Sequence, residues 1–170
     1  MLMWKTTRTS PEALGAVIRR AQGEVECLVG ADGAAALVTC QRGSPPDGVE
    51  QIDSCRVYSA GDFGPDGGPW VFAVGIWTPQ EWGPELCAWY QDEHAPMLME
   101  CRDWKGVDLR EAPSRSGRQF HVLHRLADRS ALDSPQRAAS RRTPWFDRLA
   151  RHSWFDGPFE RILYRRMDLA

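Results

Sequence analysis

The spacing of apolar residues changes along the chain, and its clearest helical stretch lies in the middle. Five positions recur there at helical spacing, most of them large and apolar: Trp82, Leu86, Trp89, Glu93 and Met97. This stripe predicts a helix with one face toward a core. Thr78-Pro79 is typical of a capped helix start. Pro96 is expected to end or kink the helix, because proline lacks an amide proton.

Alternating or continuous apolar runs on both sides of this helix predict strands. The expected strands cover residues 2–7, 24–29, 34–40, 55–59, 70–77, 107–111, 119–126 and 159–167. A second helix is expected from Pro11 to about Gln22, with Ser10 as its cap. A third is expected from Ser134-Pro135 and should break or restart at Thr143-Pro144. Residues 42–48 read as a loop.

The order of these elements predicts an α+β fold. From Trp70 onward it is strand, helix, strand, strand, helix, strand, the split ferredoxin-like unit. Residues 1–60 read as a degenerate copy in which a loop replaces the second helix. Residues 61–69, rich in Gly and Pro, read as a linker, which leaves 70–170 as the main domain. Two antiparallel four-stranded sheets can bury their open faces by forming a barrel.

Composition excludes several classes of partner. The 170 residues are 42% hydrophobic and 26% charged, ordinary for a globular protein with a core. A net charge of -2 argues against general nucleic-acid binding, which needs a basic surface. No apolar run approaches the ~20 residues of a membrane span. Residues 1–5 turn polar too early for a signal peptide, so a cytoplasmic location is expected.

The sequence carries no strong cofactor motif. The five cysteines are scattered without Cys-x-x-Cys spacing, which predicts reduced, mostly buried thiols; a catalytic thiol is the less favoured alternative. No nucleotide-binding glycine pattern, hydrolase elbow or ligand-spaced metal cluster is present. We therefore expect no cofactor and no metal. The eight tryptophans should mostly build core, with some lining a pocket.

His94 is the first candidate for chemistry, because it stands beside Tyr90 and Glu93 near the predicted helix end. The helix dipole would favour a protonated imidazole there, and burial would favour a neutral one. Either form can act as a general acid or base. The alternative is a histidine that only ties down the following loop. Glu93 falls on the apolar stripe, so its carboxylate needs a partner. It is a further catalytic candidate, and the alternative is that it only holds His94 or a backbone amide.

His121 and His124 are three residues apart on one predicted strand, so they point to opposite faces and at most one enters a cavity. Arg161 and Arg165 share one face of the last strand and would suit a carboxylate-bearing substrate, although a solvated edge or an ion pair also explains them. Three tryptophans could stack on a flat substrate or belong to the core: Trp77, Trp104 and Trp145.

The run from Trp89 to Pro96, followed by Arg102-Asp-Trp104, resembles the helix of the dimeric α+β barrel proteins, in particular the EthD-like group. Asp103 stands where that group often has glycine. The strand at 119–126 and the helix from Ser134 are also similar, so the resemblance covers roughly residues 70–167. The first half has no second Glu-His-x-Pro.

This resemblance implies a homodimer with a small-molecule pocket inside the barrel. Relatives include cofactor-free monooxygenases, isomerases, cyclases and a haem-binding branch. The expected function is cofactor-independent acid/base chemistry by an isomerase, or an esterase, lyase or cyclase, on a small unsaturated or aromatic-derived carboxylate or ketone, such as a ring-fission product. His94 would be the acid/base and an arginine would hold the carboxylate. The alternatives are a haem-dependent enzyme or haem carrier, and a non-catalytic ligand-binding or assembly protein.

Overall fold

The computed structural model describes residues 2–23, 25–63, 67–155, 157 and 159–167. The chain forms two compact units. The first contains residues 1–55 and 162–170, and the second contains residues 56–161. The division at a 61–69 linker stays a prediction, and residues 64–66 of that segment lie outside the described residues.

The first unit is a helix packed with an antiparallel sheet. Its elements are β1 (Leu2–Thr6), α1 (Pro11–Ile18), β2 (Ala21–Gln22), β3 (Glu26–Gly30), β4 (Ala36–Cys40), β5 (Arg42–Gly43) and β6 (Glu50–Asp53). The strands run in the order β6-β1-β4-β3, and the end of β11 (Glu160–Met167) pairs with β3. This order is that of a ferredoxin-like unit. With no helix between β4 and β6, the predicted degenerate half-repeat is confirmed.

Two local predictions in this unit are wrong. The first helix ends at Ile18 instead of near Gln22, because Ala21 and Gln22 pair with Arg42 and Gly43 as a two-stranded ribbon. Tertiary pairing outweighs helical propensity at this point. Residues 42–48 are consequently not all loop. The edge strand β6 was also missed, because Ile52 is its only buried residue and the segment reads as polar.

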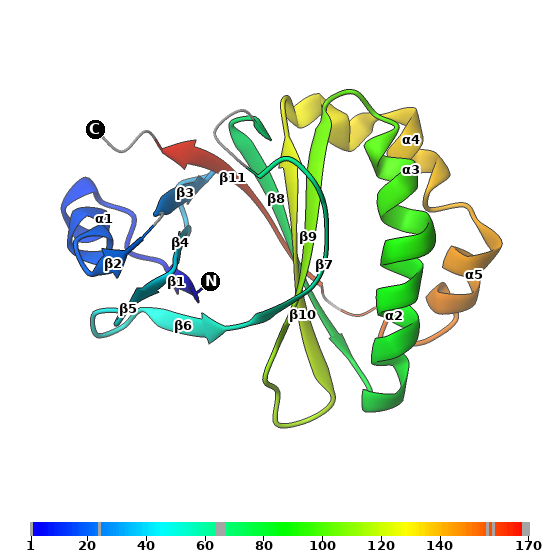
Figure 1. The fold of residues 1–170 in the computed structure, drawn as a ribbon, viewed down its shortest axis with the longest axis horizontal. Coiled ribbons are helices and arrows are strands. Elements are labelled where there is room, and N and C mark those ends of the chain that lie inside the picture. The colour runs from blue at the N-terminus through cyan, green and yellow to red at the C-terminus, as the bar shows by residue number, and fades with distance from the viewer. Residues whose placement is uncertain (1, 24, 64–66, 156, 158, 168–170) are drawn as a thin grey trace. The chain divides into compact units, whose positions relative to one another are not determined.

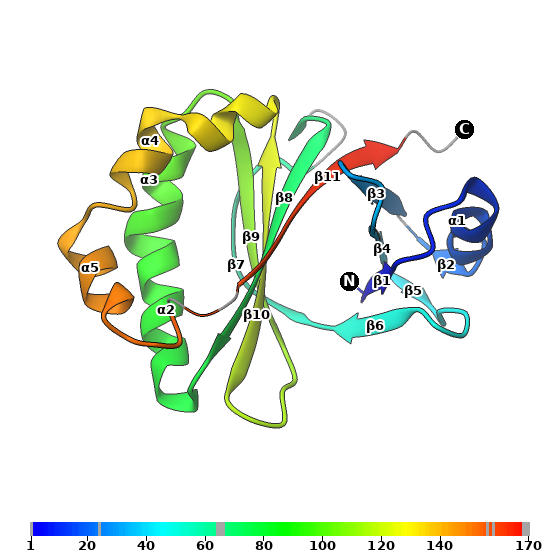
Figure 2. The ribbon, with the colours of Figure 1, turned by 180° about the vertical axis from the view of Figure 1, so that it is seen from behind.

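The second unit has the predicted order of strand, helix, strand, strand, helix, strand. Its elements are β7 (Cys55–Gly61), β8 (Trp70–Thr78), α2 (Gly83–Trp89), α3 (Ala95–Met99), β9 (Trp104–Ala112), β10 (Arg118–Leu126), α4 (Pro135–Ala139), α5 (Pro144–Ala150) and the start of β11. The strands lie in the order β11-β8-β10-β9-β7. Figures 1 and 2 show helices α2 to α5 on one face of these strands.

Strand register brings matching side chains to that helical face. Val122 of β10 lies opposite Val74 of β8 and Leu109 of β9, and His124 follows two residues later on the same face. All four side chains are buried. Because side chains alternate along a strand, His121 belongs to the opposite face.

The central helix does not end at Pro96. A 3-10 turn at Gln80–Trp82 leads into α2, a π-helical turn at Tyr90–His94 follows, and α3 continues through Pro96. Ala95 donates its N–H to the Tyr90 carbonyl, five residues back. This wider turn accommodates a proline that has no amide proton to give. His94 therefore lies inside a continuous helix and not at a C-terminus.

Of the two helix caps predicted from the sequence, Ser10 is confirmed and Thr78 is wrong. Ser10, Ser134 and Thr143 each accept a hydrogen bond from the amide three residues on, as expected of N-caps. Thr78 does not cap the central helix, since its hydroxyl bonds the Pro79 carbonyl instead. Among the described helices, none has the length and apolar character that a membrane crossing requires.

Candidate functional site

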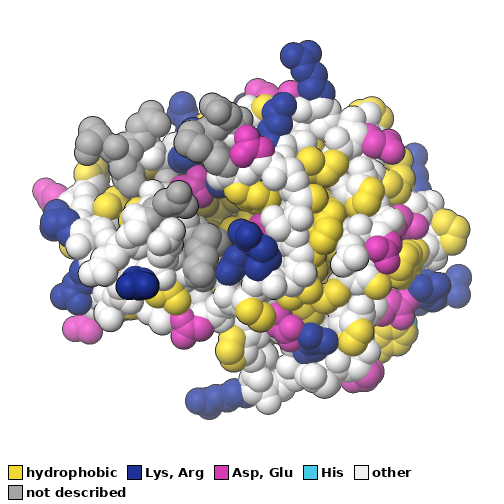
Figure 3. All heavy atoms as spheres, in the orientation of Figure 1, with side chains coloured by type: hydrophobic (Ala, Val, Ile, Leu, Met, Phe, Trp, Pro, Cys, Tyr) yellow, Lys and Arg dark blue, Asp and Glu magenta, His cyan; other side chains and the backbone are white. Residues whose placement is uncertain are grey.

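The second unit encloses a cavity of about 180 Å³ between its sheet and its helices. Phe72, Val74 and Ile76 of β8 form part of the floor, and α2 contributes Trp89 to the opposite wall. Figure 3 shows hydrophobic side chains gathered on this helical side of the unit. The cavity therefore lies on the helical side of the sheet, and not on the barrel side where the resemblance places a pocket.

His94 lies in the wall of this cavity and is 8% exposed. Its imidazole stacks on the Trp89 indole at 4.2 Å between ring centroids, with 25° between the planes, and meets the Tyr90 ring edge-on at 5.0 Å. Burial lowers the pKa of His94 to about 3; a hydrogen bond to the Ser140 backbone opposes this shift, and Arg141 adds to it. From the sequence, the helix dipole and burial had opposite expected effects on the protonation of His94. Burial determines its pKa, because the helix continues past His94 and places no helix C-terminus beside it.

His124 reaches the same cavity from β10. Trp104 meets it edge-on at 5.2 Å, Phe72 stacks on it at 5.9 Å and the Tyr90 ring lies 6.2 Å away. Burial lowers the pKa of His124 well below its ordinary value, and the neighbouring His94 adds to the shift. Burial also raises the pKa of Tyr90, so its hydroxyl stays protonated. Both imidazoles are thus neutral at ordinary pH.

Three buried nitrogen atoms on the cavity walls have no hydrogen-bond partner among the described residues. They are Nδ1 of His94, Nδ1 of His124 and Nε1 of Trp104. Buried polar groups in proteins are nearly always paired, because an unpaired one costs about 1–3 kcal/mol. Their concentration around one cavity indicates a place where a ligand supplies the missing partners.

Three arginines stand at the same cavity: Arg137, Arg141 and Arg161. Their guanidinium groups lie 5.8, 5.9 and 5.1 Å from the ring centres of Phe72, Phe146 and Phe159 respectively. Only Arg161 was a candidate from the sequence. The signal for the other two is their spacing of four residues, which places them on one side of a helical stretch. Phe72, Phe146, Phe155 and Phe159, which also line the cavity, were not predicted either.

Other predicted site residues lie away from the cavity. His121 is on the opposite face of β10, where it pairs in register with Gly75 and Arg110. Trp77 is 43% exposed and does not line the cavity. Arg165 is exposed and belongs to the first unit. Of the candidates, the structure brings together five: His94, His124, Tyr90, Trp104 and Arg161.

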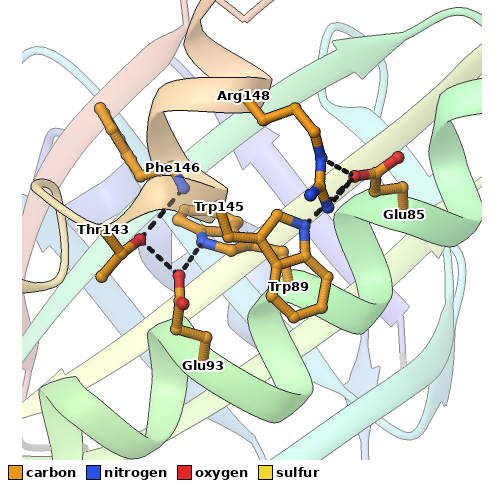
Figure 4. Close-up of polar contacts among 7 residues, drawn as sticks. All are labelled: Glu85, Trp89, Glu93, Thr143, Trp145, Phe146 and Arg148. Atoms are coloured by element: carbon orange, nitrogen blue, oxygen red, sulfur yellow. Dashed lines mark hydrogen bonds and ion pairs between the residues drawn. The ribbon is translucent and has the colours of Figure 1, made fainter.

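Glu93 holds two helices together behind the cavity. Its Oε1 accepts hydrogen bonds from Trp89 Nε1 at 3.1 Å and from Thr143 Oγ1 at 2.5 Å, and Thr143 in turn accepts from the Phe146 amide (Figure 4). Glu93 therefore has the partners that its half-buried position requires. It orients the indole on which His94 stacks, which is a positioning role.

Trp145 belongs to a second contact between the same helices. Its Nε1 donates to Glu85 Oε1 at 3.2 Å, and Arg148 donates to the same oxygen at 2.9 and 2.6 Å (Figure 4). Trp145 does not line the cavity. The two contacts fasten α5, which carries Phe146, onto the central helix.

Neither a metal cluster nor a reactive thiol marks this site. In the described part of the chain, no group of three His, Cys, Asp or Glu side chains is arranged to hold a metal ion. All five cysteines are free. Burial raises the pKa of the Cys27 thiol to about 11 and also raises that of Cys87, so neither thiol is activated.

The chain is similar to several solved structures along nearly its whole length. An anthrone oxidase-like protein superposes with a TM-score of 0.69 at 10% identity, covering 98% of this chain and 90% of that one. A ferredoxin-fold protein from Listeria monocytogenes, described as related to antibiotic biosynthesis monooxygenases, gives 0.65 at 15% identity, with 99% and 95% covered. A haem-degrading enzyme from Listeria monocytogenes gives 0.65 at 14% identity, with 97% and 99% covered.

These likenesses establish the fold. The chain has the ferredoxin-like α+β barrel fold, as the sequence predicted. At 10–15% sequence identity, these similarities do not show which reaction this chain catalyses. The narrower resemblance to the EthD-like group stays a prediction. No family model matches the chain, and no curated protein matches it.

Proposed function

We propose that this protein is a cofactor-independent enzyme that removes a proton from a flat, enolisable aromatic compound, with His94 as the base. The observation that carries the proposal is the buried, neutral imidazole whose Nδ1 has no partner among the described residues, in the wall of an aromatic-lined cavity. A neutral imidazole can accept a proton directly. The surrounding rings suit a planar ligand.

The surroundings of His94 favour the charge that proton transfer creates. A pKa of about 3 makes the imidazole a weak base in the empty cavity. An enolate formed beside it raises that pKa, because opposite charges at short range stabilise each other. The Trp89 ring, stacked at 4.2 Å, and the Ser140 backbone also favour the imidazolium. The indole N–H of Trp104, a cavity residue whose nitrogen has no partner among the described residues, is our candidate donor to the enolate oxygen.

The enolate then has two outcomes. Reprotonation at another carbon gives isomerisation, one of the outcomes expected from the sequence. Addition of O2 to the carbanion carbon gives a hydroperoxide; loss of water then leaves a new carbonyl, with one oxygen atom retained and the other leaving with two hydrogens. The names of the similar structures, anthrone oxidase-like and related to monooxygenases, favour oxygenation. Esterase or lyase chemistry and a homodimer stay predictions.

Two assays with one pair of variants test this function. The first follows deuterium uptake at C1 of 2-tetralone in D2O without oxygen, by NMR. The second follows O2 consumption with the same two-ring ketone in air, which fits the size of the cavity. We expect the wild type to accelerate both, and His94→Gln to lose about 100-fold or more of the acceleration, as for loss of a general base. His152→Gln is the matched control, since His152 packs against Trp82 and stacks on Trp154, and does not line the cavity. Full activity of His94→Gln would refute the proposal.

Haem does not fit this cavity. An engineered protein cavity of about 150 Å³ binds benzene. The cavity here, at about 180 Å³, has room for one or two fused rings and not for a macrocycle many times larger. His94 and His124 offer unpaired ring nitrogens, but their neighbours pack against both rings.

A further inference from the structure

A second cavity adjoins the first within the second unit. It measures about 340 Å³ and shares three wall residues with the first cavity: Arg137, Arg141 and Phe146. Arg142 and Asp133 also line it. Two arginines thus stand in the wall common to both cavities, where a group on a ligand in the first cavity can reach them.

This common wall carries positive charge without a matching negative charge. No carboxylate lines the first cavity among the described residues, and Asp133 is the one acid on the described walls of the second. None of Arg137, Arg141 and Arg161 forms an ion pair with a described carboxylate. Burial is the largest cause that lowers the pKa of Arg137; Arg141 and Arg161 lower it further as like charges, and Asp133 opposes them.

Two acids on the facing helix already have other partners. Glu93 is engaged by Trp89 and Thr143, and Glu85 by Trp145 and Arg148. An anion from outside would therefore relieve the repulsion within the arginine group.

Arg137 is held in place before any ligand arrives. Its Nη1 donates to the Leu132 carbonyl at 2.5 Å, and its guanidinium lies over the Phe72 ring. Arg141 similarly lies over Phe146. A guanidinium fixed by stacking keeps a planar set of donors free for two parallel hydrogen bonds to a carboxylate.

We propose that the ligand of this cavity is an aromatic carboxylate, whose ring system fills the first cavity and whose acid group is held between Arg137 and Arg141 at the wall of the second. This proposal rests on the proposed function for the location of the site. It adds the class of substrate that the site binds. The first cavity sets the size of the ring system at one or two rings. The second cavity leaves room for a carboxylate attached to the ring system directly or through a short linker.

The test compares acids with a neutral isostere of the same size. 2-Naphthoate, 2-naphthylacetate and 2-naphthamide are titrated into the full chain, with binding followed by calorimetry and by quenching of tryptophan fluorescence, since Trp89 and Trp104 line the cavity. We expect both acids to bind about tenfold or more tightly than the amide, as charged hydrogen bonds predict. Equal affinity of acids and amide would overturn the proposal.

Two variants locate the effect. Arg137→Gln and Arg141→Gln should each lose most of the preference for the acids over the amide. Arg148→Gln is the control, because Arg148 pairs with Glu85 away from the cavity. Arg137→Gln loses the hydrogen bond to the Leu132 carbonyl and could be less stable for that reason. Arg141 is exposed, so Arg141→Gln should fold normally and still tests the proposal. An acid preference that survives in Arg141→Gln would overturn the assignment.

The outcome is separable from that of the proposed function. His94→Gln should keep the preference for acids while losing deuterium exchange. If exchange depends on His94 but acids and amide bind alike, the arginine proposal fails and the proton-transfer proposal stands. If acids bind through the arginines and no deuterium exchange occurs, the arginine proposal stands and the proton-transfer proposal fails.

Discussion

Thr143 donates a hydrogen bond to Glu93 at 2.5 Å, although the two residues are 50 apart in the sequence. The same hydroxyl accepts from the Phe146 amide at 3.0 Å and so caps α5. One side chain thus begins a helix and fixes that helix to the turn that carries His94.

Thr143→Ala should lower the free energy of unfolding by about 1–3 kcal/mol, because it removes an N-cap and leaves a half-buried carboxylate with one partner fewer. Chemical denaturation measures the effect. Thr143→Ser keeps the hydroxyl and should lose much less. A wild-type stability for Thr143→Ala would show that the cap and the carboxylate contact contribute nothing.

His94 should make stability depend on pH in a defined window. Its pKa is about 3 in the folded chain and 6.5 as the ordinary value, so between these pH values the unfolded chain binds the proton more readily. The stabilisation is complete above pH 6.5 and is lost as pH falls toward 3, on the order of 5 kcal/mol at most.

The check is the unfolding free energy of the wild type and of His94→Gln between pH 8 and pH 4. The wild-type curve should fall more steeply on acidification, and His124 should leave a residual slope in both. Parallel curves would mean that His94 titrates normally. Because the pKa of His94 is about 3, its imidazole stays deprotonated between pH 8 and pH 4. Protonation of His94 should therefore not lower activity at mildly acidic pH.

Gly117, in the turn between β9 and β10, should not tolerate a side chain. Its φ is +75°, and an added Cβ would lie 2.2 Å from the Thr78 carbonyl oxygen. Gly117→Ala should therefore lower the melting temperature by several degrees, from backbone strain and the clash together. Gly33→Ala is the matched control, because Gly33 has a similar φ of +73° and no atom within 4 Å of the added Cβ. Equal losses in the two variants would exclude the clash as a cause.

Haem should not bind in the cavity. Titration of haemin into the chain should give no sharpened Soret band that depends on His94, because the space of about 180 Å³ is too small. Imidazole-ligated haem would shift that band, and His94→Ala would abolish the shift. Observation of both would contradict the size argument and restore the haem alternative.

The candidate site shows why sequence reasoning reached some residues and not others. His94, Tyr90 and Trp104 were found through one local run of the sequence. Arg137 and Arg141 were missed because arginines in a short helix and in the turn after it usually face solvent, and only the packing of this segment brings them to the cavity. Trp77 and Trp104 look alike in the sequence, yet Trp77 is exposed and Trp104 is buried.

By itself, the sequence determined the order of strands and helices from Trp70 to Met167 and the cap at Ser10. These depend on side-chain periodicity and on hydrogen bonds between residues three apart, which are local. Tertiary structure decided the π-helical turn before Pro96, the neutral state of His94 and which of His121 and His124 faces the cavity. Those depend on burial and on contacts between residues distant in the sequence, which no local pattern contains.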